Sequence, residues 1–308
     1  MSRMKAIGRV GAVTALVLGS LAYGSPARAG PTHLRIVFGH TFSSGNVDIV
    51  SVLPDGTDLQ RLTKRPAFDA CAAGSPNGKF ISFCSDASGS LEIWTMLRDG
   101  SHRHQSTHLG YASDPDYRLA RGHHKRLAFT ADVGNGHDIY LVHIHGRNLL
   151  RLTHNPAADD FPAWSPNRVG EVIAFVSDRS GTPQVYTMRP NGSHVTRLTR
   201  DPNGVTDGPD WSPDGSKIVF AAGPAGAEDI FVMNADGSQV TRLTTDPAGD
   251  FAPAWSPDGT QIAFLSLRVP GSRNVFVMNA DGTDQHSISA AGSTDFAPAW
   301  LPKRGVPA

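Results

Sequence analysis

Short apolar runs separated by polar turn segments fill the chain from residue 34 to residue 300. Runs such as residues 261–265 and 274–278 are apolar at successive positions, without the strict alternation of a strand that has one face in water. This pattern predicts short strands that are buried on both faces. It leaves almost no stretch with the period of a helix.

The apolar runs recur in a fixed order. A first marker position, about 45 residues from one copy to the next, holds Gly74, Tyr117, Trp164, Trp211, Trp255 and Trp300. A second marker, Arg-Leu-Thr, begins at Arg61, Arg151, Arg197 and Arg242, and degenerate forms occupy residues 105–107 and 287–289. Both markers keep the same period, so the chain holds six copies of one structural unit.

Each unit contains four predicted strands. Between the first and second strands lies a turn such as Ser256-Pro257-Asp258-Gly259, in which proline presets φ and glycine accepts a left-handed conformation. Four-stranded units of this length, arranged around an axis, predict an all-β protein, a six-bladed β-propeller. Residues 34–38 read as the second strand of a blade, and residues 295–300 supply its first strand, so we expect the C-terminal strand to complete the N-terminal blade.

The repeat resembles that of the TolB-like (PD40, WD40-like repeat) β-propellers, whose units read Pro-x-Trp-Ser-Pro-Asp-Gly, Ile-Ala-Phe, Ser-Asp-Arg-x-Gly, Ile-Tyr-x-Met, Asp-Gly and Arg-Leu-Thr. Residues 161–199 match this pattern almost element by element, and the resemblance covers residues 34–302. Between Gly30 and Leu34 there is no room for the α/β domain that precedes the propeller in TolB, so we expect a stand-alone propeller. The resemblance implies a binding platform, with partner proteins held at the mouth of the channel.

Residues 1–29 are interpreted as a secretory signal peptide, because Arg3, Lys5 and Arg9 precede an apolar run at 11–23 and a cleavage-type Ala27-Arg28-Ala29. Residues 30–308 then form one domain, exported to a periplasm or to the outside of the cell, with no membrane insertion once the signal is removed. The chain has 28 basic and 28 acidic residues, which argues against nucleic acid as a partner. We expect a monomer that binds a protein or another component of the envelope or the extracellular space.

An aspartate precedes the first marker in all six units: Asp69, Asp114, Asp159, Asp207, Asp250 and Asp295. Because the first strand of a propeller blade lines the channel, these residues are predicted to ring one channel mouth and to attract a basic segment, a cation or polar groups of a partner. The alternative interpretation is that each aspartate caps a turn in its own loop. Two loops that depart from the repeat, residues 131–137 and 267–273, are candidates for individual function.

No Gly-x-Ser-x-Gly elbow and no HExxH motif occurs in the chain, so no catalytic residue, metal ligand or cofactor is assigned. Histidines are concentrated between residues 102 and 154, but His143 and His145 align with turn positions of other units. The leading hypothesis is therefore a non-enzymatic binding scaffold. The alternative is a metal-dependent propeller enzyme, of glycan lyase or hydrolase type, with Asp and His side chains at the channel.

Cys71 and Cys84 flank a turn at residues 75–78. If Gly74 faces Ile81 across this hairpin, Cys71 faces Cys84 in the same register. Export permits oxidation, so the pair is either a disulfide or two buried thiols.

Overall fold

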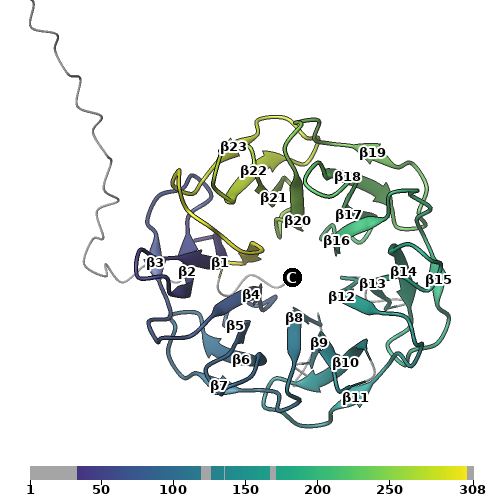
Figure 1. The fold of residues 1–308 in the computed structure, drawn as a ribbon, viewed down its shortest axis with the longest axis horizontal. Coiled ribbons are helices and arrows are strands. Elements are labelled where there is room, and N and C mark those ends of the chain that lie inside the picture. The colour runs from purple at the N-terminus through teal and green to yellow at the C-terminus, as the bar shows by residue number, and fades with distance from the viewer. Residues whose placement is uncertain (1–32, 119–125, 135, 167–170, 304–308) are drawn as a thin grey trace, which may run out of the picture.

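The computed structural model describes residues 33–118, 126–134, 136–166 and 171–303. The predicted signal peptide lies outside these ranges. In the described ranges the chain forms six four-stranded antiparallel sheets arranged around one axis (Figure 1). The sequence-based prediction of an all-β, six-bladed propeller is confirmed. The described ranges hold no helix with the length and apolar character that a membrane crossing requires.

Strands of four kinds lie at increasing distance from the axis (Figure 1). The innermost strands are β4 (Asp69–Gly74), β8 (Ala112–Tyr117), β12 (Asp159–Trp164), β16 (Val205–Trp211), β20 (Asp250–Trp255) and β24 (Ala299–Leu301). The second strands are β1 (Arg35–Thr41), β5 (Phe80–Ser85), β9 (Arg126–Asp132), β13 (Ile173–Ser177), β17 (Lys217–Ala222) and β21 (Gln261–Ser266). The third strands are β2 (Val47–Val52), β6 (Glu92–Leu97), β10 (His137–His143), β14 (Gln184–Met188), β18 (Asp229–Asn234) and β22 (Asn274–Asn279). The outermost strands are β3 (Gln60–Arg61), β7 (His104–Gln105), β11 (Leu150–Arg151), β15 (Thr196–Arg197), β19 (Thr241–Arg242) and β23 (His286–Ser287).

Blade 1 is assembled from both ends of the propeller, in the order β24-β1-β2-β3. Ile36 of β1 pairs with Trp300 of β24, and the contact extends toward the channel mouth through a bridge between His40 and Asp295. The other blades are continuous in sequence: blade 2 is β4–β7, blade 3 is β8–β11, blade 4 is β12–β15, blade 5 is β16–β19 and blade 6 is β20–β23. The expected closure of the N-terminal blade by the last strand is confirmed.

The apolar core is divided among the spaces between blades. Each cluster of buried side chains draws on two neighbouring blades, as where Phe38 of β1 and Leu265 of β21 meet between blades 1 and 6. Between blades 1 and 2, Val37 of the same strand packs with Phe83 of β5. Adjacent residues of β1 therefore point into different clusters, which explains why the second and third strands are apolar at successive positions.

The Arg-Leu-Thr marker attaches each short outermost strand to the third strand. In blade 3, Thr153 Oγ1 accepts a hydrogen bond from the Ile139 N–H at 2.9 Å and donates one to Asp138 Oδ1 at 3.0 Å. Arg151 pairs with the other oxygen of Asp138 at 2.6 Å. The buried residues at the Asp138 position are Asp48, Glu92, Asp138, Gln184, Asp229 and Asn274. This polar position at the third strand supplies an acceptor for the hydroxyl in five blades. In blade 6 the direction is reversed, because the Asn274 amide donates to Ser289 Oγ at 3.2 Å.

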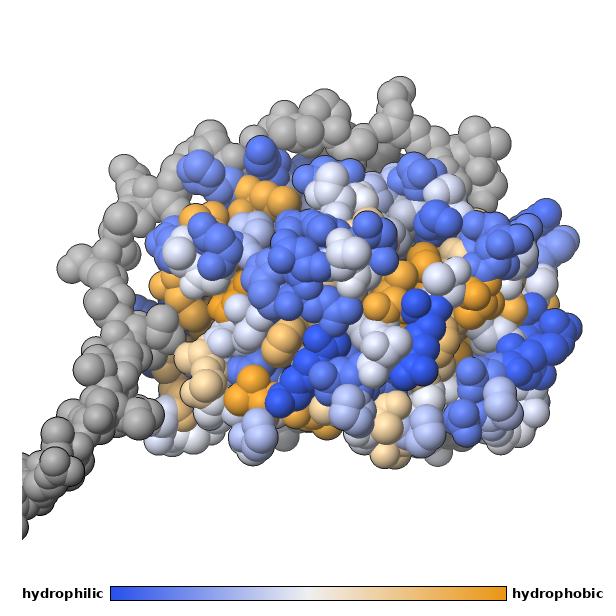
Figure 2. All heavy atoms as spheres, turned by 90° about the horizontal axis from the view of Figure 1, so that it is seen from above, coloured by the Kyte–Doolittle hydropathy of each residue, from blue (hydrophilic) through white to orange (hydrophobic). Residues whose placement is uncertain are grey.

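Viewed from the side, the ring is a low drum (Figure 2). The visible wall is largely hydrophilic, and hydrophobic side chains lie in small separate groups on it (Figure 2). The exposed large hydrophobic residues among those described are Val133, Leu149, Leu150, Val195, Val240 and Leu267.

Candidate binding site in the central channel

A β-bulge interrupts the inner strand of blades 2 to 6. In β8 the register with β9 shifts between Ser113 and Asp116, and in β12 the register with β13 shifts between Asp160 and Ala163. In blades 2, 3, 4 and 6 the bulge places one residue at positive φ, for example Asp114 at 51° and Phe161 at 53°. Bulges of this kind redirect a side chain away from the sheet. Here the redirected side chains turn into the channel.

These positions line a pocket on the axis, with a volume of about 130 Å³, which we call the channel pocket. Every blade contributes to its wall, through Cys71, Asp114, Phe161, Asp207, Ala252 and Ala297. Prolines stand beside these residues in five blades, at Pro115, Pro162, Pro209, Pro253 and Pro298. Proline has no N–H to donate, so it is accommodated at a bulge of an edge strand and keeps that edge from pairing.

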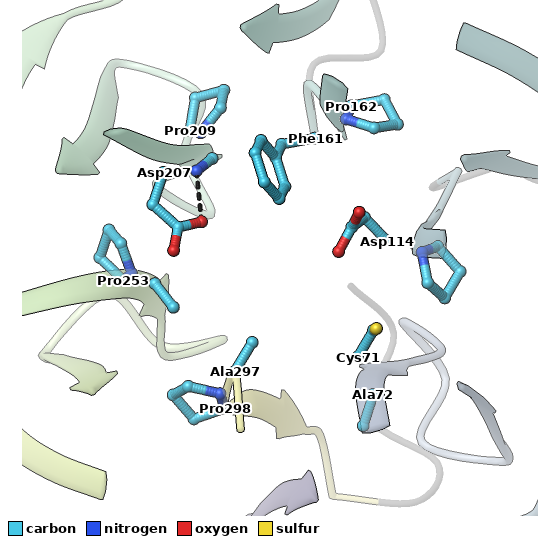
Figure 3. A pocket seen from close by; sticks show the side chains of 13 residues that line it. Cys71, Ala72, Asp114, Phe161, Pro162, Asp207, Pro209, Pro253, Ala297 and Pro298 are labelled. Carbon is cyan, nitrogen blue, oxygen red and sulfur yellow. Dashed lines mark hydrogen bonds between the residues drawn. The ribbon is translucent and has the colours of Figure 1, made fainter. Parts of the chain in front are cut away.

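Asp114 and Asp207 are the carboxylates of the channel pocket, and Figure 3 shows both pointing into it, on either side of the Phe161 ring. Asp114 accepts a hydrogen bond from Ser113 Oγ at 2.7 Å, and Asp207 accepts one from the Gly208 N–H at 2.7 Å. Burial raises the pKa of Asp114 to about 6 and that of Asp207 to about 7. Neither carboxylate forms a salt bridge with a side chain of the described ranges.

The other four aspartates of the predicted ring are buried at the mouth end of their blades. Asp159 binds Arg179 at 2.7 and 2.9 Å, and Asp250 binds Arg268 at 2.5 Å. Both arginines come from the loop that connects the second and third strands of the same blade.

In blade 1, Asp295 pairs with His40 Nδ1 at 2.7 Å. Hydrogen bonds from Ser85 and Thr63 lower the pKa of the fourth aspartate, Asp69, but its burial outweighs them and leaves the pKa raised. The structure thus brings Asp114 and Asp207 to the pocket, and it places the other four inside the blades.

Two further acids of the channel were missed by sequence reasoning. Asp116 Oδ2 accepts a hydrogen bond from the Trp164 N–H of the next blade at 2.6 Å, and Asp210 Oδ2 accepts one from the Trp255 N–H at 2.6 Å. Burial raises the pKa of Asp116 to about 7 and that of Asp210 to about 6. Their signal in the sequence is the residue directly before the first marker, which is Asp in blades 3 and 5 and Ala in the other four.

A polar cluster lies at the channel mouth between blades 3 and 4, where residues 131–137 depart from the repeat. His137 Nδ1 is 2.7 Å from Asp160 Oδ1, and the Tyr111 ring stacks on the His137 ring with centroids 5.2 Å apart. Asp160 precedes Phe161 directly, so this cluster adjoins the channel pocket. In the second divergent loop, residues 267–273, Arg273 lies over the Phe296 ring at 4.3 Å.

The histidine-rich segment brings His104, His143 and His145 together at the outer part of blades 2 and 3. The His104 and His145 ring centroids are 5.0 Å apart, and those of His143 and His145 are 5.3 Å apart. His145 lies in the turn after β10, where the repeat predicts a turn. No group of three or more His, Cys, Asp or Glu side chains with an arrangement suited to a metal ion is present among the described residues. His123 and His124 lie outside them.

Cys71 and Cys84 are joined by a disulfide, with their Cα atoms 5.4 Å apart. Gly74 pairs with Ile81 as expected, but the expected pairing of Cys71 with Cys84 in the same register is wrong, because the bulge places Ala70 opposite Cys84. Cys71 is the bulged residue of β4, with φ of 46°, so one end of the disulfide lines the channel pocket. The disulfide therefore connects the channel wall to the fully buried Cys84 of the second strand.

The chain thus forms six four-stranded blades, and its first and last strands pair to close the ring around a central cavity. These features define a closed β-propeller. The family model described as the TolB beta propeller domain (PD40) matches residues 121–203 and 199–306. The chain belongs to this family.

Curated relatives match part of the chain. A protein TolB homolog of Chlorobium luteolum is 34% identical over 161 residues, which are 50% of this chain and 35% of that protein. A Tol-Pal system protein TolB of Nitratidesulfovibrio vulgaris is 27% identical over 139 residues, or 44% of this chain and 29% of that protein. The matched region thus spans about a third of these relatives.

Solved structures share the fold over most of the chain. TolB from Acinetobacter baumannii superposes with a TM-score of 0.74 at 21% identity, covering 87% of this chain and 67% of that chain. Hydrazine synthase of Kuenenia stuttgartiensis gives a TM-score of 0.71 at 16% identity, covering 91% of this chain and 48% of that chain. These similarities establish the fold, which proteins of different function share.

Proposed function

We propose that this protein is an exported, non-enzymatic scaffold that binds a protein partner of the cell envelope or the extracellular space at the mouth of its channel. The observation that carries the proposal is the channel pocket, where Asp114 and Asp207 point into a cavity on the axis and form no salt bridge within the described ranges (Figure 3). Unpaired carboxylates in a partly apolar cavity favour a partner that brings positive charge.

Three further considerations support this function. The family is that of the TolB β-propeller, and the relatives include proteins named as components of the Tol-Pal system. The first residues of the chain have the pattern of a secretory signal. The channel pocket has carboxylates and apolar walls, and its chemistry suits recognition of a side chain better than the activation of a water or a nucleophile.

Site-specific photocrosslinking in cells that produce the protein tests this function. A photoreactive amino acid replaces Thr206, an exposed residue of β16 at the channel mouth, and in a separate variant replaces Thr283, an exposed residue of the turn at the opposite face. We expect a discrete crosslinked protein from position 206 and none from position 283. Crosslinking from position 283 alone, or from neither position, would contradict a partner at the mouth.

A further inference from the structure

The channel pocket combines three kinds of surface. Its wall is built from prolines and small apolar residues, the ring of Phe161 enters it from blade 4, and the carboxylates of Asp114 and Asp207 enter it from blades 3 and 5 (Figure 3). Figure 3 shows the Phe161 ring between the two carboxylates. A ligand that fits all three surfaces needs an apolar stem and a positively charged, planar end group.

This protein already uses the same combination inside its blades. Arg61 lies over the Phe42 ring at 4.0 Å and pairs with Asp48. Arg179 lies over Phe175 at 5.3 Å and pairs with Asp159. In each case a guanidinium group stacks on an aromatic face and donates hydrogen bonds to a carboxylate at its edge. No cation of the described ranges lies over Phe161 in this way.

We propose that the channel pocket is a socket for one arginine side chain of the partner, with the guanidinium plane on the Phe161 ring and its N–H groups donating to Asp114 and Asp207. This inference rests on the proposed function and names the chemical group that the mouth recognises. A guanidinium has five N–H donors in a rigid fork, so it can reach carboxylates on two sides of a ring at once, whereas an ammonium is a compact point charge.

The electrostatics of the channel pocket favour such a ligand. Burial raises the pKa of Asp114 to about 6 and that of Asp207 to about 7, and an acidic neighbour adds to each rise, Asp160 for Asp114 and Asp114 for Asp207. A cation between the two carboxylates offsets both the burial and the repulsion. The pocket volume of about 130 Å³ suits a single side chain and is too small for a folded segment.

The test uses the mature protein and three short peptides, acetyl-Gly-Arg-Gly-amide and its counterparts with lysine or with citrulline, which is neutral and nearly isosteric with arginine. Binding is followed by nuclear magnetic resonance titration at pH 8. We expect the arginine peptide to bind about 10-fold more tightly than the citrulline peptide and several-fold more tightly than the lysine peptide. Equal affinities for arginine and citrulline, or for arginine and lysine, would overturn the proposal.

Variants then assign the binding to the socket. Asp114→Asn and Asp207→Asn should each reduce the preference for arginine over citrulline by about 3- to 10-fold, and Phe161→Leu should reduce the preference for arginine over lysine. Asp178→Asn removes an exposed carboxylate from a loop of the same face and serves as the control, with the preference unchanged. An equal loss in the Asp178 variant would mean that only the net charge of the face matters, and the socket would be rejected.

The two proposals fail in different ways. Crosslinks from position 206 without any arginine preference would leave the scaffold function in place and reject the socket. An arginine preference that depends on Asp114, Asp207 and Phe161, without crosslinks from position 206, would retain the socket and reject a partner protein at the mouth.

Discussion

Asp207 lies half-buried in the channel, and its surroundings set its charge. Burial is the largest influence and raises its pKa to about 7, while the N–H groups of Gly208 and Ala252 act in the opposite direction and the nearby carboxylates of Asp114 and Glu228 add to the rise. In the unfolded chain the same group titrates near 3.8. Between these values the folded protein binds more protons than the unfolded chain, so the contribution of Asp207 to stability is present below pH 4 and is lost as pH rises through 7.

Replacing this carboxylate by an amide should remove that loss. We expect Asp207→Asn to be more stable than the wild type at pH 8 by roughly 1–2 kcal/mol, after allowance for the water in the channel, and to match it near pH 3.5. Urea unfolding at both pH values measures the difference. The Asp178→Asn variant should show no such change with pH, and a stability difference for Asp207→Asn that is the same at both pH values would contradict the assignment.

At the scale of single strands, the outermost strand of each blade is only two residues long and depends on a side-chain contact. In blade 5, Thr244 is buried, and its Oγ1 accepts a hydrogen bond from the Ile230 N–H at 2.9 Å and donates one to Asp229 at 3.3 Å. Thr241, three residues earlier in the same segment, is exposed. The same substitution at these two threonines therefore distinguishes the effect of the hydroxyl contact, made by Thr244 alone, from the effect of a change in strand propensity.

Thr244→Val should destabilise the protein by about 2 kcal/mol, because it leaves the buried Ile230 N–H without its acceptor and removes the donor to Asp229 Oδ1, while Arg242 still pairs with Asp229 Oδ2. Thr241→Val should change the stability by less than about 0.5 kcal/mol. Thermal unfolding of the two variants measures both values. A similar effect of both substitutions would indicate that the hydroxyl of the marker has no special role.

The strands were predictable because the turn residues and the apolar runs of the sequence indicate the same strand boundaries. Turn residues such as Pro257 and Gly259 fix where strands end, and apolar runs such as that of β21 identify strands with two buried faces. The side chains that reach the channel were harder to predict. A bulge inserts an extra residue into the inner strand, so the simple alternation of faces fails there, and Phe161 and Cys71 face the channel.

Burial separates the other predicted aspartates from the channel pocket. Asp159 and Asp250 occupy the repeat position expected for the channel mouth, but Arg179 and Arg268 in neighbouring loops pair with them and take them out of the solvent. Asp159 and Asp250 stand five residues before the first marker, whereas Asp114 stands three and Asp207 four residues before it. The irregular pairing of the inner strand brings these later positions to the channel pocket. The Asp before the marker in blades 3 and 5 was visible as an exception to Ala.

At the scale of the whole molecule, the ring closes in blade 1, where β24 pairs with β1 and also lies against β4 of blade 2. Gly74 stands there in place of the aromatic first marker, and a Cβ atom at this position would lie 2.3 Å from the carbonyl oxygen of Trp300. Backbone that lies this close to another strand has no room for a side chain. The missing aromatic residue in the second unit is thus explained by the approach of β24, the strand that closes the ring.

Gly74→Ala should lower the stability by about 2–3 kcal/mol, since the backbone of β24 must shift to make room. The control is Gly249→Ala, where the closest atom is the flexible Glu228 carboxylate at 2.4 Å, and the expected cost is below about 1 kcal/mol. Thermal unfolding compares the two. An equal loss of stability in the two variants would mean that β24 can shift without loss of ring closure and that closure does not require glycine at position 74.

The sharing of blade 1 between β1 and β24 also governs the order in which the chain acquires its shape. In blades 2 to 6 the four strands follow one another in the sequence, whereas β1 gains its inner neighbour only when β24, near the end of the chain, has been made. During that interval the nascent molecule is an open arc with an unpaired edge, which is the kind of species that other chains can join. A chain truncated before β24 would consequently keep an unpaired edge at β1 and would tend to aggregate. It would not close into a smaller ring.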